Sequence, residues 1–117
     1  MEYRILGKTG LKISRLGFGG IPIQRIDAEG TKKLLHEMVK KGINYIDTVS
    51  EEYMGYAMEG IRDKFVVATK SMARTKDAMR ADIETSLGNL RTDYIDLYQV
   101  HNPSMEQLEQ VMGEDGA

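Results

Sequence analysis

The sequence predicts an α/β fold, which we interpret as about the first half of a (β/α)8 barrel preceded by an N-terminal β-hairpin. Short apolar runs alternate with amphipathic segments of helical period, one such pair in roughly 25 to 30 residues. Because parallel strands need crossover connections, this alternation indicates a parallel sheet built from βαβ units. Polar residues also recur where successive strands are expected to end, which favours a barrel.

The hairpin is expected within residues 1–14. Two short extended pieces, residues 3–6 and 11–13, lie on either side of a turn bracketed by Gly7 and Gly10. Two extended pieces joined through a glycine-containing turn are typical of a hairpin.

A third strand is expected at residues 16–20, and Pro22 should block immediate helix formation after it. The first long helix then begins after Asp27, a suitable N-cap, and ends at Gly42. Its apolar face is predicted from residues at helical spacing: Leu34, Leu35, Met38 and Val39.

The remaining residues repeat the strand and helix pattern. The predicted strands cover residues 43–48, 65–70 and 94–101, and the predicted helices cover residues 51–59, 76–90 and a last segment capped by Ser104 that runs through Val111. We therefore expect one partial domain over residues 1–117, with about four strand and helix units in residues 15–117.

A count of about four strand and helix units fits a doubly wound open sheet as well as a barrel. The positions of the polar residues favour the barrel, because Gly19, Asp47, Lys70 and His101 each lie at or just past the end of a successive strand. The carboxyl ends of the strands are where a (β/α)8 barrel, also called a TIM barrel, gathers its chemistry.

Five segments, in order and at suitable spacing, resemble the aldo-keto reductase family, and together they extend over almost the whole chain. They are Leu6-Gly7-Lys8-Thr9-Gly10-Leu11, Leu16-Gly17-Phe18-Gly19-Gly20, Gly42-Ile43-Asn44-Tyr45-Ile46-Asp47-Thr48, Ala68-Thr69-Lys70 and Thr92-Asp93-Tyr94-Ile95-Asp96-Leu97-Tyr98-Gln99-Val100-His101. The opening also resembles a branch of the family that carries a ferredoxin-like carboxyl-terminal extension.

The resemblance implies an NAD(P)H-dependent oxidoreductase that reduces an aldehyde or ketone to an alcohol, with NADP(H) or NAD(H) as cofactor. The family's catalytic aspartate, lysine and histidine correspond to Asp47, Lys70 and His101. Gly19, Gly20 and Asp47 are the expected cofactor contacts, and no metal site is expected. In this chemistry the lysine would favour phenolate and so lower the pKa of a tyrosine proton donor, the aspartate would hold the lysine charged, and the histidine would orient the substrate oxygen.

The tyrosine of the family pattern is missing. It should follow Thr48 by a few residues, but only Val49 and Ser50 stand before the helix motif that begins at Glu51. Either the loop is lost or the sequence joins segments across a gap. Tyr53, inside the helix motif, is an alternative donor.

Each candidate also has a structural interpretation. Asp47 could cap a turn, Lys70 could be a charge at a strand end, and His101, before Asn102-Pro103, could be a turn histidine. Gly19 and Gly20 could simply turn the strand. The second histidine, His36, is expected at the surface among charged residues.

Composition excludes several classes of function. The formal net charge of −2 gives no field of one sign for nucleic acid or an anionic membrane, and no apolar run is long enough to span one. The absence of cysteine excludes disulfides and thiolate metal sites within these residues. With no leader at the N-terminus, a cytoplasmic protein is expected.

Two alternatives to a reductase remain open. One is a non-catalytic relative that binds a nicotinamide nucleotide or a partner. The other is a half-barrel that completes itself as a homo-oligomer, because four strands leave two edges and half of a barrel core uncovered.

Overall fold

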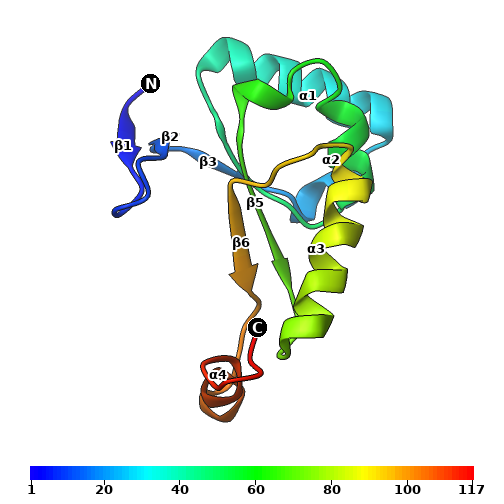
Figure 1. The fold of residues 1–117 in the computed structure, drawn as a ribbon. Helices are drawn as coiled ribbons and strands as arrows, with labels where there is room; N and C mark the ends of the chain where they lie inside the picture. The colour runs from blue at the N-terminus through cyan, green and yellow to red at the C-terminus, as the bar shows by residue number, and fades with distance from the viewer.

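The computed structural model describes residues 1–117 and contains two separate sheets (Figure 1). In the first, β1 (Tyr3–Ile5) and β2 (Lys12–Ser14) pair as an antiparallel hairpin. The second is a parallel sheet in the order β3-β4-β5-β6, formed by β3 (Gly17–Gly19), β4 (Tyr45–Asp47), β5 (Val66–Ser71) and β6 (Leu97–Val100). The predicted hairpin and the predicted parallel βαβ units are thus confirmed.

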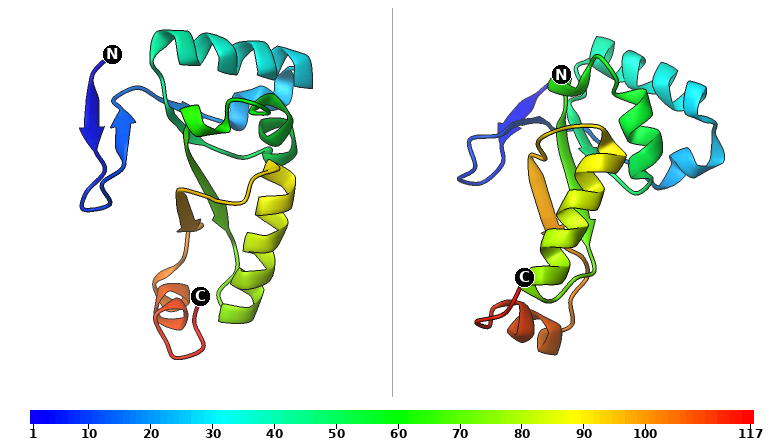
Figure 2. Two further views of the ribbon diagram at one scale, coloured as in Figure 1. Left: turned by 45° about the horizontal axis from the view of Figure 1, so that its top comes forward. Right: turned by 45° about the vertical axis from the view of Figure 1, so that its right-hand side comes forward.

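The helices that connect the parallel strands lie on one side of the sheet (Figures 1 and 2). They are α1 (Ala28–Lys41), α2 (Glu51–Ala57) and α3 (Lys76–Leu90), with short 3-10 helices η1 (Ile21–Arg25) and η2 (Arg62–Lys64), and α4 (Met105–Val111) beyond the end of β6. None of these helices combines the length and the apolar character that crossing a membrane would require.

The caps expected for α1 are confirmed. The Asp27 carboxylate accepts a hydrogen bond of 2.7 Å from the Gly30 N–H, and Gly42 ends the helix at a positive φ of 76°. Residues with a side chain rarely adopt this left-handed conformation, so a glycine is the natural terminator.

Two local predictions are wrong. Pro22 does not block helix formation, because it lies in the first turn of η1, where a residue without an N–H leaves no hydrogen bond unmade. Leu34 does not belong to the buried face of α1 and is 36% exposed, whereas Thr31, Leu35 and Met38 are buried.

Strand β6 begins at Leu97 rather than at residue 94 as predicted. The Asp96 carboxylate accepts a 2.9 Å hydrogen bond from the Val67 N–H and pairs with Arg62 at 2.9 Å. The Asp96 side chain thus occupies an N–H of β5 that a backbone carbonyl would otherwise use, so regular strand pairing starts only at Leu97.

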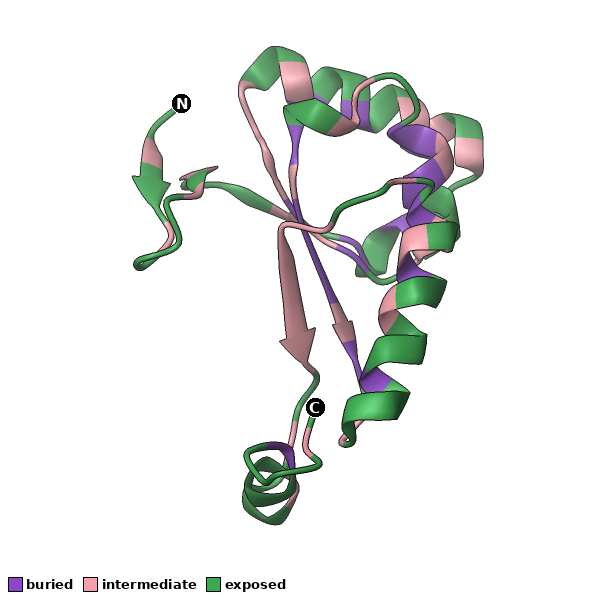
Figure 3. Cartoon of the chain, in the orientation of Figure 1, coloured by how far each residue is buried: buried purple, intermediate pink, exposed green.

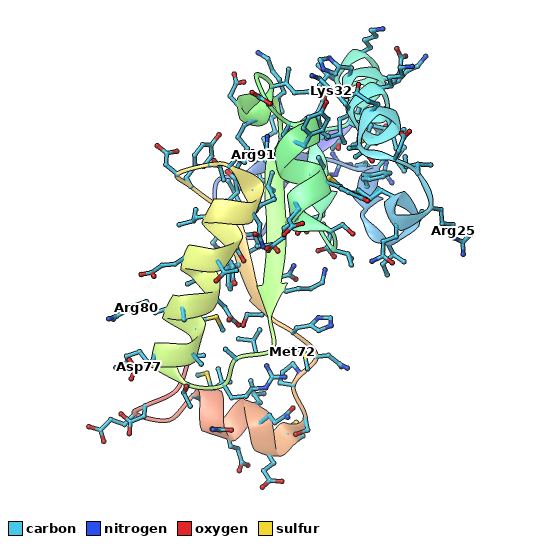
Figure 4. All side chains as sticks on the ribbon, turned by 90° about the vertical axis from the view of Figure 1, so that its right-hand side faces the viewer. Arg25, Lys32, Met72, Asp77, Arg80 and Arg91 are labelled. Atoms are coloured by element: carbon cyan, nitrogen blue, oxygen red, sulfur yellow. The ribbon has the colours of Figure 1, made fainter.

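The hydrophobic core lies between the sheet and helices α1 and α2. Figure 3 shows the buried positions gathered along β5 and on the inner faces of the helices, while β6 is only half-buried throughout. Residues Val67, Ala68 and Thr69 are buried in succession, as expected for a strand covered on both faces. On the outer side of α3, Asp77 and Arg80 extend into solvent (Figure 4).

The hairpin is attached to the parallel sheet through Asn44. The Asn44 side-chain oxygen accepts from the Ser14 N–H at 2.6 Å, and the Asn44 N–H donates to the Ser14 hydroxyl at 3.0 Å. These reciprocal bonds hold the end of β2 beside the start of β4.

Both edges of the parallel sheet are unpaired. Strand β3 pairs only with β4, and β6 pairs only with β5. Free edges present unpaired N–H and C=O groups that can add further strands.

A glycine at the crossing of α2 and α3 gives a stability prediction. A Cβ on Gly55 would lie 2.2 Å from the Asn89 carbonyl oxygen, so Gly55→Ala must push two backbones apart and is expected to destabilise the fold by about 1–3 kcal/mol. Gly88→Ala is the control, because a Cβ there meets nothing within 4 Å and should stabilise α3 by about 0.5–1 kcal/mol. Urea unfolding of both variants measures the difference. Equal stability of the two would contradict this account.

Candidate active site

The register of β4 and β5 brings a carboxylate and an ammonium together. Asp47 pairs with Ala68, and Lys70 lies two residues further along β5, so both side chains emerge on the same face. The Lys70 Nζ donates to the Asp47 Oδ1 at 2.7 Å and to the Thr48 carbonyl oxygen at 2.9 Å. The two residues thus form a half-buried ion pair at the carboxyl end of the sheet.

His101 follows the end of β6, and its backbone is fixed on both sides. Its N–H donates to the Ser71 carbonyl oxygen at 2.8 Å, and its own carbonyl accepts from the Arg74 guanidinium at 2.7 Å. The imidazole itself is exposed and forms no hydrogen bond with another residue. The side chain is therefore available to a ligand.

One cavity of about 490 Å³ brings all the predicted site residues together. Its walls include Gly19, Gly20, Asp47, Lys70 and His101. The remaining lining residues are Ile21, Val49, Gln99, Val100 and Asn102. Four strands that are distant in sequence therefore contribute to one site, as their polar ends indicated.

The two glycines of the cavity differ in their surroundings. A Cβ on Gly20 would lie 2.9 Å from the Val49 nitrogen and 3.0 Å from the Asp47 carbonyl oxygen, so packing against the chain after β4 already accounts for glycine there. A Cβ on Gly19 would meet nothing within 4 Å. Packing within the chain therefore gives no reason for a glycine at position 19.

No tyrosine lines this cavity. The connection from β4 to α2 consists of Thr48, Val49 and Ser50 alone. Tyr53, the alternative donor, lines a different cavity of about 520 Å³ between η1 and α2. The structure thus places Tyr53 away from the predicted site residues.

Two other tyrosines lie near the ion pair in sequence or space. The ring of Tyr45 packs against Gly17 in β3. Its burial raises the pKa of the Tyr45 hydroxyl, and the negative charge of Asp47 adds to this effect. Burial also raises the pKa of Tyr98, whose hydroxyl lies 3.1 Å from that of Ser86 on the helix side of the sheet. Both phenols are therefore weaker acids than an exposed tyrosine.

Sequence reasoning missed two groups in the site. Gln99 lines the cavity, and it pairs with Lys70 in the register of β5 and β6. The alternation of side chains along a strand could have found it, because it precedes His101 by two residues. The Thr48 carbonyl could not have been found, since its contact with Lys70 depends on the course of the short connection.

The arrangement supplies a positive charge held in place by a carboxylate, beside an imidazole, in a recess at the carboxyl ends of parallel strands. Fixed charges in such a recess can stabilise negative charge that develops on a bound oxygen. The fold and the site together define half of a parallel α/β barrel with its polar groups at the barrel mouth.

Comparison with known proteins identifies the family. The model of the aldo/keto reductase family matches residues 15–113, and the chain belongs to this family. Aldo-keto reductase YhdN of Bacillus subtilis is 35% identical, with 97% of this chain and 43% of YhdN aligned. That alignment extends over 142 residues, more than the 117 of this chain, so YhdN has segments without a counterpart here.

Solved structures give the same result. The holo form of aldo-keto reductase AKR11C1 from Bacillus halodurans superimposes with a TM-score of 0.80 at 31% identity, over 95% of this chain and 43% of that one. An aldo-keto reductase from Klebsiella pneumoniae in complex with NADPH has a TM-score of 0.73 at 27% identity, over 86% and 40%. The chain thus spans less than half the length of these relatives and corresponds to half of their barrel.

Proposed function

We propose that this protein is an NAD(P)H-dependent oxidoreductase that reduces an aldehyde or ketone to an alcohol. The observation that carries the proposal is the ion pair of Lys70 and Asp47 in a cavity that His101 also lines. Supporting it, a family member from Klebsiella pneumoniae has been solved with NADPH.

The residues present fit a nicotinamide cofactor at the wall formed by Gly19. Because a Cβ there meets no atom, the backbone offers a flat surface that a planar ring can approach closely. When bound, the reduced nicotinamide supplies a hydride to the carbonyl carbon. Gly20 and Asp47 would form the adjoining part of the same wall.

The chain's own side chains then act on the carbonyl oxygen. The Lys70 ammonium has three N–H groups, of which Asp47 and the Thr48 carbonyl take two. The third can face the cavity and stabilise the negative charge that develops on the oxygen. Asp47 holds the ammonium in position, and the His101 imidazole contacts the oxygen from the next strand.

Cofactor binding and turnover test this proposal. The protein should bind NADPH or NADH with quenching or enhancement of the cofactor fluorescence, and an aldehyde should then cause oxidation of the cofactor. Absence of binding of both nucleotides would overturn the proposal.

A non-catalytic nucleotide-binding protein is the second candidate, and the absence of a tyrosine from the cavity favours it. It predicts nucleotide binding without aldehyde-dependent oxidation. Self-association is favoured by a different observation, the free edges of β3 and β6. Sedimentation of the chain distinguishes a compact dimer from a monomer.

A further inference from the structure

We infer that His101 is the proton donor of the reduction in this protein, in the place of a tyrosine hydroxyl. The inference rests on the proposed function and assigns a chemical step that an orienting histidine does not perform. Its basis is the set of side chains that share the cavity with the ion pair.

Reduction of a carbonyl needs an acid as well as a hydride, and no tyrosine lines the cavity that holds Asp47, Lys70 and His101. Tyr53 opens into a different cavity. The ring of Tyr45 packs against Gly17, and the hydroxyl of Tyr98 is engaged with Ser86. The raised pKa of both Tyr45 and Tyr98 weakens them further as acids.

Lys70 is also poorly suited to give up a proton. Its ammonium donates at 2.7 Å to the Asp47 carboxylate and at 2.9 Å to the Thr48 carbonyl. Transfer of a proton from this ammonium would disturb two charge-assisted hydrogen bonds. Lys70 is therefore an electrostatic stabiliser.

Within the part of the cavity that this chain lines, His101 is the group best placed to act as the acid. Among the lining side chains, only Asp47, Lys70 and His101 titrate, and the first two are paired with each other. The imidazole is exposed and unpartnered, while hydrogen bonds to Ser71 and Arg74 fix its backbone. A fixed backbone with a free imidazole allows the ring to deliver a proton into the cavity and to regain one from solvent.

The step balances as a two-electron reduction. The carbonyl carbon gains a C–H bond from the hydride of the reduced nicotinamide dinucleotide, which becomes oxidised. The carbon–oxygen π pair moves to the oxygen, and a new O–H bond forms as the N–H bond of the His101 imidazolium breaks. The neutral imidazole is then protonated again by water.

Three charged side chains share the surroundings of His101. Asp47 at the end of β4 and Lys70 on β5 line the same cavity, and Arg74 after β5 binds the His101 carbonyl, while α4 contributes the neutral Gln107. Because the donor must carry its proton, turnover should be highest at low pH and fall as the imidazole loses its charge.

The experiment compares His101→Asn with His36→Asn in the full-length protein, because the chain has only these two histidines. An asparagine side chain can still donate a hydrogen bond to an oxygen but has no transferable proton. His101→Asn should lower kcat by roughly 10²–10⁴-fold and abolish the fall of kcat with rising pH. His36→Asn, on the exposed face of α1, should change neither.

A second measurement does not depend on turnover. The imidazole resonances of the two histidines are followed by NMR while a simple primary amide, which has a carbonyl oxygen but accepts no hydride, is added to the cofactor-bound protein. The His101 resonance should shift and the His36 resonance should not. If the His101 resonance does not shift, or if His101→Asn has an unchanged kcat and pH profile, the inference is overturned but the proposed reductase function is not. Nucleotide binding without turnover at any pH overturns both this inference and the reductase function.

Discussion

A tyrosine-bearing loop inserted between Thr48 and Glu51 is expected to raise kcat for aldehyde reduction by roughly 10²–10⁴-fold, the usual contribution of a well-placed acid. About five residues are needed to carry a phenol over the cavity that Lys70 and His101 line. There the Lys70 ammonium would favour phenolate and so lower the pKa of the new tyrosine. In this variant, the further substitution His101→Asn should lower kcat only slightly, since the phenol would then supply the proton.

The same loop with phenylalanine is the matched control, because it restores the length of the connection without the hydroxyl. Turnover is measured by cofactor oxidation under saturating aldehyde, and folding by far-UV circular dichroism. If the tyrosine and phenylalanine loops gave equal rates, the short connection would have no bearing on proton delivery.

Replacing Lys70 with methionine should lower kcat by roughly 10²–10³-fold, because it removes the fixed positive charge next to the developing oxyanion. The side chains are similar in length, so the loss comes from the charge and its hydrogen bonds to Asp47 and Thr48. NADPH affinity should change much less than kcat if the cofactor binds against Gly19, as proposed above. Steady-state kinetics and fluorescence titration separate these two effects.

Lys76→Met serves as the control for loss of a lysine charge, because Lys76 is exposed at the start of α3. It should leave both kcat and NADPH affinity unchanged. If Lys70→Met were as active as Lys76→Met, Lys70 would have no role in the reaction.

Local chemistry made much of the fold predictable. Helix α3 has the predicted bounds of residues 76–90, because Thr75 caps it and helix-forming residues continue to Leu90. The boundaries that failed depend on tertiary contacts. The start of β6 is set by the hydrogen bonds of Asp96 to Val67 and Arg62, which no local pattern encodes.

The site was predictable to the same extent. The strand pattern placed Asp47 and Lys70 at the ends of successive strands, and the family resemblance implied that the two side chains meet. The register of β4 and β5 accounts for that contact. The roles of these residues stay predictions until turnover is measured. The packing of Gly20 against Val49 and the contact of Lys70 with Thr48 lay beyond sequence reasoning, because both depend on the path of a three-residue connection.

Helix α2 is secured independently of the connection that leads into it. Its first residue, Glu51, accepts hydrogen bonds from the Thr69 hydroxyl at 2.6 Å and from the Asn89 amide at 3.2 Å, and Gly55 sets it directly against α3. The length of the preceding connection can therefore change without displacing α2. Loops at this end of the sheet can vary while the strands and helices keep their positions.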